Sequence, residues 1–528
     1  MAEDQVTLKI EGVDVTVPRG TTVLEAAKRA GILIPHYCYH PGLPVSGVCR
    51  MCLVTVEGAP GLQIACATDA TDGQVVSVFD SAASDARQAV LEFLLINHPL
   101  DCPICDQAGE CELQDYVFQE GRARTRYSDY PKRFSPVEDF GGDVLYVPNR
   151  CILCTRCIRF MDHVAEESVL NVSERGDRAF IGIHPDAVLD HPWAGNVIDL
   201  CPVGSLISKD FLHKAYAWQL DRTPGICTGC SQGCNITIET RDNSIARLRP
   251  RTNEDVNRYF MCDHGRFEYR WMNSGDRIEA PLVAGANGLV ATDWSQAIAR
   301  CAEIVKGVSG KAVALVSPRA SCESLYLVHQ LLKDFELLSA CPVEVVEGEQ
   351  PLPGVPNLAL RSERAPNVEG AARLGHGAEY DKALEAVKDA ALVFVLDDGY
   401  SQFGDDALSG SENLIYLGTS LPDAARNSSV VFPMSNAAEE DGTYVNRDGR
   451  VQRYMQAKTA PGMARPAWWI TGALLSEIRG TDAPATAGEV FDRMAASESA
   501  FAGLSYETLG TQGAFANKAS GAGVGCDS

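Results

Sequence analysis

The chain is 528 residues long, which at ~100–200 residues per domain predicts roughly three to five domains. Acidic residues outnumber basic ones by 70 to 46, giving a formal net charge of −24, so the composition excludes a predominantly basic nucleic-acid-binding protein. Apolar residues make up 45% of the chain, as in ordinary globular proteins. The unusual feature is the cysteine content of 19 residues, fifteen of which lie between Cys38 and Cys262.

The cysteines are expected to bind metal rather than form disulfides. The first residues lack the basic start and apolar core of a secretory signal. No apolar run approaches the ~18 residues that a membrane span needs. These patterns favour a cytoplasmic chain, and in a reducing compartment clustered thiols are typical of metal ligands.

The N-terminal residues predict a small α+β domain over 1–81. Apolar residues alternate over 6–10 and again over 13–17, which predicts a β-hairpin. Thr22 and Glu25 have the spacing of a capping box that opens a short helix, and Gly31 is placed to end that helix. A loop rich in glycine, proline and cysteine follows.

After residue 81, the pattern of cysteines and apolar residues changes twice along the chain. An amphipathic helix is predicted over 82–97, within a loop-rich, cysteine-bearing region over 82–218, and another cysteine-rich domain is predicted over 219–279. From residue 280 to 509, apolar runs alternate with helical stretches such as 323–335, which predicts an α/β domain containing a loop or linker at about 346–380. A flexible tail is expected over 510–528. The apolar runs are 312–316, 392–396, 414–417 and 430–432.

The first cysteine group has the spacing of a [2Fe–2S] site. Three cysteines lie close together on a loop and a fourth follows at a distance, as in plant-type ferredoxins with a longer first gap. A zinc site is the alternative, because two cysteines separated by two residues also suit zinc. The first group is Cys38, Cys49, Cys52 and Cys66.

Two further groups each supply four cysteines, the number that a [4Fe–4S] cluster requires. The third group combines a CxxCxxC run with a distant Cys-Pro pair, which is a ferredoxin-type pattern, and a zinc knuckle is its alternative. The fourth group has a zinc ribbon as its alternative. The third group is Cys151, Cys154, Cys157 and Cys201, and the fourth group is Cys227, Cys230, Cys234 and Cys262.

The second group has only three cysteines, Cys102, Cys105 and Cys111. His98 lies four residues before the first of them, and we expect its imidazole to occupy the fourth ligand position of a [4Fe–4S] cluster. A neutral imidazole in place of a thiolate makes such a cluster less negative and raises its reduction potential.

Arginines lie beside several of these cysteines. Arg50 and Arg156 are expected to face the clusters and offset the charge of thiolate-bound iron, whereas Arg159 suits that role and an ordinary surface position equally well. No nucleotide site is predicted, because only two residues separate Gly307 from Gly310 where a phosphate loop needs four. No nucleophilic triad is indicated either, so no catalytic residue is proposed in this chain.

Taken in order, these groups resemble the large iron–sulfur subunit of NADH–quinone oxidoreductase, respiratory complex I. The resemblance covers residues 4–275 closely and returns in the 439–446 and 449–452 motifs. It implies a β-grasp ferredoxin-like first domain, one [2Fe–2S] and three [4Fe–4S] clusters, and an electron path from the first group to the third and then to the second. It also implies partners: a flavin-bearing NADH-oxidising subunit, a small [2Fe–2S] subunit and quinone-module subunits. They would hold the chain, peripherally, on the cytoplasmic side of the cell membrane.

The fourth group and the domain after it also resemble molybdopterin oxidoreductases, so a subunit of an NAD-linked formate dehydrogenase or NAD-reducing hydrogenase is one alternative. His264 stands where those dehydrogenases generally carry lysine, and only about 200 residues follow residue 280, so the resemblance implies a shortened domain without molybdopterin. Iron-only hydrogenases resemble residues 1–200 alone. A zinc-binding scaffold without a redox role is the remaining alternative.

Overall fold

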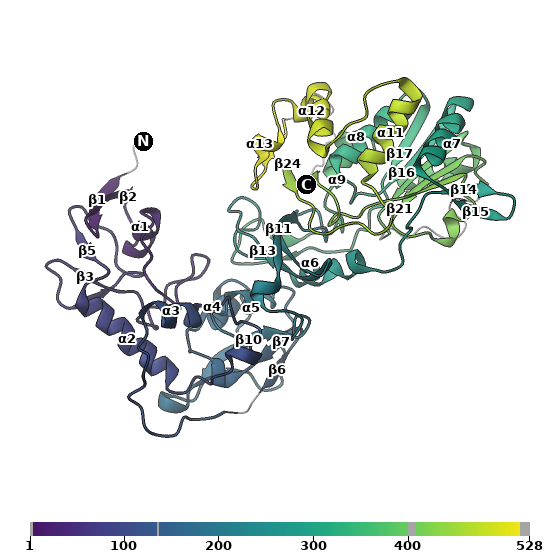
Figure 1. The fold of residues 1–528 in the computed structure, drawn as a ribbon. Coiled ribbons are helices and arrows are strands. Elements are labelled where there is room, and N and C mark those ends of the chain that lie inside the picture. The colour runs from purple at the N-terminus through teal and green to yellow at the C-terminus, as the bar shows by residue number, and fades with distance from the viewer. Residues whose placement is uncertain (1–3, 135–136, 400–407, 409, 518–528) are drawn as a thin grey trace. The chain divides into compact units, whose positions relative to one another are not determined.

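The computed structural model of the chain describes residues 4–134, 137–399, 408 and 410–517, and it divides into two compact units (Figure 1). One unit consists of Met1–Leu220 and Leu352–Pro356, and the other of Asp221–Pro351 and Asn357–Ser528. Within the described ranges, we find no helix with both the length and the apolar character needed to cross a bilayer.

The N-terminal unit begins with a five-stranded sheet that carries one short helix. Its elements are β1 (Gln5–Ile10), β2 (Val13–Pro18), α1 (Val23–Arg29), β3 (Leu53–Val56), β4 (Leu62–Ile64) and β5 (Val75–Ser77). The strand order is β2-β1-β5-β3-β4, and β1 and β2 form the predicted hairpin. Thr22 caps α1 by accepting a hydrogen bond from the Glu25 N–H, which is half of the predicted capping box, and the Glu25 carboxylate instead accepts one from the Tyr39 hydroxyl at 2.8 Å. That bond ties α1 to the cysteine loop.

The rest of this unit is loop-rich, as predicted. Its helices are α2 (Ser81–Leu95), α3 (Glu112–Glu120), α4 (Arg156–His163) and α5 (Asn196–Leu200), and its strands are β6 (Glu138–Gly141), β7 (Val144–Tyr146), β8 (Leu170–Ser173), β9 (Phe180–Ile183) and β10 (Leu206–Ser208). Two small sheets, with orders β10-β7-β6 and β8-β9, hold the loops in place. The helix predicted over 82–97 is α2.

A short segment from much later in the chain completes the N-terminal unit. Leu352 is fully buried, and the Gly354 N–H donates a hydrogen bond to the Val164 carbonyl at 2.8 Å. A Cβ on Gly354 would lie 2.6 Å from the Val164 Cα, so only glycine fits there. The predicted linker over 346–380 is therefore partly a packed segment of this unit.

The C-terminal unit opens with the three-stranded sheet β11 (Asp221–Ile226), β12 (Asn235–Arg241) and β13 (Ser244–Pro250), followed by α6 (Asp263–Phe267). A seven-stranded sheet then forms its centre. The strands are β14 (Leu282–Gly285), β15 (Gly288–Ala291), β16 (Lys311–Val316), β17 (Glu336–Ala340), β20 (Leu392–Asp397), β21 (Leu414–Gly418) and β22 (Val430–Pro433). Their order is β15-β14-β22-β21-β20-β16-β17, and β22 to β17 run parallel.

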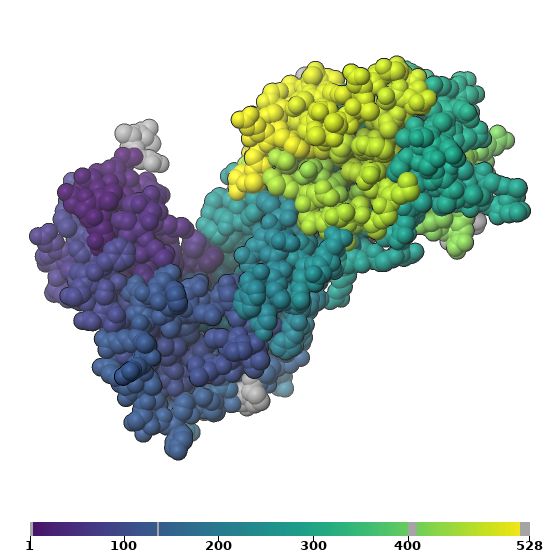
Figure 2. Space-filling view, viewed as in Figure 1, coloured from purple at the N-terminus to yellow at the C-terminus, as the bar shows by residue number. Residues whose placement is uncertain are grey.

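Helices cover both faces of this sheet, so it is a three-layer α/β arrangement. Phe394 on β20 faces one core, whereas its neighbours Val393 and Val395 face the other. The helices are α7 (Trp294–Gly307), α8 (Cys322–Leu332), α9 (Val368–Arg373), α10 (Tyr380–Ala386), α11 (Ala467–Arg479), α12 (Ala487–Ser497) and α13 (Tyr506–Leu509). In Figure 2 the teal surface around α7 adjoins the yellow-green surface of α11, which packs beside it. All four predicted apolar runs are strands of this sheet, and the prediction of an α/β domain is confirmed.

Two segments that the sequence predicts to be a linker and a flexible tail contain secondary structure. The linker over 346–380 contains the strand pair β18 (Gln350–Pro351) and β19 (Ala359–Leu360) and all of α9. The tail expected from residue 510 includes β25 (Ala514–Phe515), which pairs with β24 (Arg450–Tyr454), itself paired with β23 (Gly442–Val445). The Arg450 guanidinium lies 4.7 Å from the centre of the Phe515 ring, so this segment has a packing partner that composition does not reveal. Residues 518–528, including Cys526, lie outside the described residues.

Candidate metal centres

Three cysteines of the first group lie on the loop between α1 and β3, and the fourth, Cys66, lies just after β4. Cys38, Cys52 and Cys66 are buried, and the Ala65 N–H donates to the Cys52 carbonyl at 3.0 Å, so strand pairing sets the position of Cys66. Hydrogen bonds from Cys49 and Cys66 hold the pKa of the Cys38 thiol well below its usual value, and a hydrogen bond with Cys66 lowers the pKa of Cys52. The four sulfurs thus form one continuous group.

In the second group, Cys105 and Cys111 are buried, Cys102 is exposed and His98 is half-buried. Cys111 directly precedes α3. Burial lowers the pKa of His98 and the nearby Arg150 charge adds to that shift, which favours the neutral imidazole that a metal ligand requires. Burial raises the pKa of Cys105 and Arg150 opposes this shift, which places Arg150 close to both predicted ligands.

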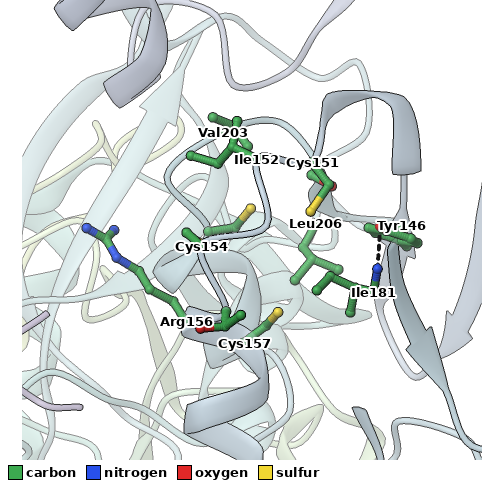
Figure 3. A pocket seen from close by; sticks show the side chains of 12 residues that line it. Tyr146, Cys151, Ile152, Cys154, Arg156, Cys157, Ile181, Val203 and Leu206 are labelled. Atoms are coloured by element: carbon green, nitrogen blue, oxygen red, sulfur yellow. Dashed lines mark hydrogen bonds between the residues drawn. The ribbon is translucent and has the colours of Figure 1, made fainter. Parts of the chain in front are cut away.

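The third group lines a small hollow together with Tyr146, Arg156 and Leu206 (Figure 3). Cys157 is on α4, and Cys201 directly follows α5. Between Cys151 and Cys157, two residues, Leu153 and Thr155, have left-handed backbone conformations. That backbone turns the three nearby cysteines toward one hollow. Burial raises the pKa of Cys151 to about 11 and that of Cys154 to about 12. Buried thiols around a hollow suit a group that replaces their protons with iron.

The fourth group lies in the C-terminal unit, on the loop between β11 and β12 and at the start of α6. The Cys227 N–H donates to the Cys234 carbonyl at 2.8 Å, and all four cysteines of the group are buried. A Cβ on Gly265 would lie 2.5 Å from the Cys227 sulfur, so only glycine leaves room for this ligand. Residues of the 439–452 region hold the loop: the Asn446 and Gln452 side-chain amides donate to the Gln232 and Gly233 carbonyls at 3.3 and 3.1 Å.

The predicted arginines differ in their surroundings. Arg50 is exposed, at a left-handed backbone position beside Cys49. Arg156 is buried and donates to the Leu200 carbonyl, next to Cys201, at 3.3 Å. Arg159, which the sequence leaves undecided between two roles, is also buried.

Sequence reasoning passed over Arg150 and Gly204. Arg150 is buried, donates to the Asp101 carboxylate at 3.0 Å and shifts the pKa of His98. Gly204 lies so close to Cys105 that a Cβ would be 2.2 Å from its sulfur. The position of Gly204 three residues after Cys201 is the one sequence signal that could have pointed to it.

In the part of the chain that the structure describes, no set of three or more His, Cys, Asp or Glu side chains is arranged around a single metal ion. An iron–sulfur cluster spreads its ligands around several iron and sulfide atoms, so its cysteines lie farther apart than the ligands of one ion.

Five family models match successive segments of the chain. They are a 2Fe-2S iron-sulfur cluster binding domain (3–79), the NADH-ubiquinone oxidoreductase-G iron-sulfur binding region (87–126), the ferredoxin-like domain of NADH-quinone oxidoreductase subunit 3 (141–207), the molybdopterin oxidoreductase Fe4S4 domain (220–274) and molybdopterin oxidoreductase (381–477). Each predicted cysteine group lies in or beside one of the first four segments.

Curated relatives agree with these matches. An NADH-quinone oxidoreductase subunit of the G type, from Rickettsia felis, is 38% identical over 62% of this chain and 48% of its own length. The mitochondrial NADH dehydrogenase [ubiquinone] iron-sulfur protein 1 of Solanum tuberosum is 40% identical over 62% of this chain and 45% of its own length. The chain thus spans about half the length of these relatives. A solved NAD+-reducing [NiFe]-hydrogenase matches 41% of this chain and 91% of that chain, with 31% identity and a TM-score of 0.36, too low to support an argument.

Proposed function

Because its first 274 residues carry the iron–sulfur domains found in the large iron–sulfur subunit of NADH–quinone oxidoreductase, we propose that this chain relays electrons within such an oxidoreductase. The observation that carries the proposal is the folding of three predicted ligand groups into one unit, where buried side chains link them. The relay takes electrons from a flavin-bearing NADH-oxidising subunit and delivers them toward quinone through other subunits.

The proposed cofactors are one [2Fe–2S] cluster in the first group and three [4Fe–4S] clusters in the others. Such clusters, when bound, accept and release one electron at a time. The chain itself supplies fifteen thiolates and the His98 imidazole as ligands, excludes water by burial, and sets each potential through nearby charges. Cys102 is exposed and Cys49 and Cys151 are partly buried, whereas the other predicted cysteine ligands are buried. Arg50 and Arg156 contribute positive charge.

The surroundings of the third group show how the chain tunes such a site. The Tyr146 hydroxyl accepts a hydrogen bond from the Ile181 N–H at 3.1 Å, which orients that hydroxyl at the edge of the hollow. Hydrogen bonds from Tyr146 and Ser205 lower the pKa of Cys151, against the larger effect of burial. Donors of this kind stabilise negative charge on sulfur and raise a cluster's potential.

The C-terminal α/β domain is proposed as a scaffold that holds the fourth group and binds no molybdopterin. Partner subunits, namely the flavin subunit, a small [2Fe–2S] subunit and the quinone module, would attach the chain peripherally at the cytoplasmic side of the cell membrane. The translocase activity of the whole complex is part of the same proposal.

Metal analysis and spectroscopy of the full chain, purified without oxygen, test this function. We expect about 14 irons per chain with equivalent acid-labile sulfide, and no zinc or molybdenum. Electron paramagnetic resonance (EPR) should show one [2Fe–2S] and three [4Fe–4S] signals on reduction. Stoichiometric zinc would establish the scaffold alternative, and one molybdenum per chain would establish the formate-dehydrogenase alternative.

A further inference from the structure

Helix α4 places two buried arginines, Arg156 and Arg159, one turn apart. The helix belongs to the third group, because Cys157 lies on it and Cys154 lies just before it. Both guanidinium groups extend from this helix to the loop that carries Cys38.

Arg159 joins the two groups directly. Its Nη2 donates hydrogen bonds to the backbone carbonyl of Cys38, in the first group, and to that of Cys154, in the third, the second of these at 3.4 Å. Its Nη1 donates to the Pro44 carbonyl at 2.5 Å, which fixes the guanidinium plane against the loop. One nitrogen atom thus touches a predicted ligand residue of each group.

The electrostatics also tie this side chain to both groups. Burial lowers the pKa of Arg159, and the charges of Cys38 and Cys154 are the two largest influences that oppose this shift. The guanidinium therefore lies within the field of both thiols.

Arg156 makes a different set of bonds. It donates to the Tyr39 carbonyl at 2.8 Å and to the Leu200 carbonyl at 3.3 Å, both one residue away from a predicted ligand. It also pairs with the Glu112 carboxylate at 3.0 Å, so part of its charge is neutralised. Arg156 braces the loops, whereas Arg159 contacts the ligand residues themselves.

We propose that Arg159 is the electronic connection between the first and third groups, an inference that rests on the proposed relay function. One electron passes from the first group through the Cys38 carbonyl, the guanidinium and the Cys154 carbonyl to the third. With clusters bound at both groups, the first would be oxidised by one electron and the third reduced by one; no covalent bond would change, and the Arg159 guanidinium would keep its protons. Its positive charge, shared between two clusters of thiolates, also raises both reduction potentials.

Two substitutions of Arg159 distinguish the effect of its positive charge from that of its hydrogen bonds to the two groups. Arg159→Met removes both, so the midpoint potentials of the first and third clusters should fall together and transfer between them should slow. Arg159→Lys keeps the charge, so both potentials should stay close to those of the unsubstituted chain. The lysine ammonium ends one bond short of the position of Nη2, and it has no second nitrogen to bond the Pro44 carbonyl, so it cannot hold the Cys38 and Cys154 carbonyls together and transfer should still slow.

The measurements are potentiometric EPR titrations of each cluster and laser-flash reduction followed by absorbance, on the full chain with its clusters assembled. Arg87→Met is the matched control. It removes a buried guanidinium of the same unit that donates to the Val78 carbonyl at 2.9 Å, and it should leave the third cluster's potential unchanged. If Arg159→Met prevents the first cluster from assembling, Arg159→Gln, which keeps two donors without the charge, replaces it.

The proposed connection is refuted if the Arg159→Lys chain transfers electrons between the two clusters as fast as the unsubstituted chain. It is also refuted if Arg159→Met, or Arg159→Gln in its place, shifts the midpoint potential of only one of the first and third clusters. The proposal would also be overturned if Arg87→Met lowered the midpoint potential of the third cluster as much as Arg159→Met does. Missing cluster signals in the unsubstituted chain would instead refute the relay function, so the two failures are distinguishable.

Discussion

Replacing Gly204 with alanine should remove one cluster and leave the other three. The new Cβ would lie 2.2 Å from the Cys105 sulfur and 3.1 Å from the Gln107 Cβ. Non-bonded atoms of this kind settle at about 3.5–4.0 Å, so the sulfur would have to retreat by about 1.5 Å. Ligand distances at metal sites tolerate only about 0.2 Å, so Cys105 could no longer serve the second group.

The assay is iron content together with EPR of the reduced full chain. Gly204→Ala should lose about four of about 14 irons and the signal of the second cluster. Gly265→Ala should lose the fourth cluster instead, because its Cβ would meet the Cys227 sulfur at 2.5 Å. Gly275→Ala is the control, since nothing lies within 4 Å of its Cβ position. If Gly204→Ala keeps its full iron content and all four signals, the assignment of Cys105 as a ligand is wrong.

Three further predictions concern single side chains. His98→Cys should lower the midpoint potential of the second cluster, because a thiolate adds negative charge, and an unchanged EPR titration would remove His98 from the ligand set. Burial raises the pKa of Glu440 to about 8 from its usual 4.5, so the folded C-terminal unit keeps a proton that the unfolded chain releases. Its stability should therefore fall as pH rises from about 4.5 to about 8, by roughly 1.4 kcal/mol per pH unit, and level off above. Urea unfolding followed by tryptophan fluorescence should show this slope reduced in Glu440→Gln, and equal slopes would contradict it. Arg277→Met removes two bonds of 2.7 Å from the buried Glu439 carboxylate, which keeps Lys458 at 3.5 Å as a partner. It should destabilise the same unit by about 1.5–3 kcal/mol in the same assay, and a change below about 1 kcal/mol would show that the pair contributes little.

Local patterns carried most of the fold. The alternation of Val6, Leu8 and Ile10 is enough to predict β1, because burial on one face of a strand repeats every two residues. The fully apolar run 392–396 likewise predicts a strand buried on both faces, and it is the middle of β20. Cysteine spacing is also a local pattern: most members of each group lie close together in the sequence, so spacing alone is enough to assign the predicted ligands to groups.

Features that depend on distant residues could not be predicted in this way. Arg159 meets the carbonyl of Cys38, 121 residues away, and a carbonyl has no sequence signature. An arginine three residues after Arg156 looks the same whether it faces solvent or another loop. Gly204 is constrained by a sulfur 99 residues earlier in the chain, and the strand β25 depends on a partner in β24.

The insertion of residues 352–356 into the N-terminal unit has a consequence for how the protein is made. As the chain leaves the ribosome, residues 1–220 emerge as a unit that still lacks Leu352 in its core and Gly354 beside Val164. The whole stretch Asp221–Pro351 must be synthesised before that gap closes. The N-terminal unit therefore cannot finish folding in strict order of synthesis, and a fragment ending at residue 220 would lack part of its own interior.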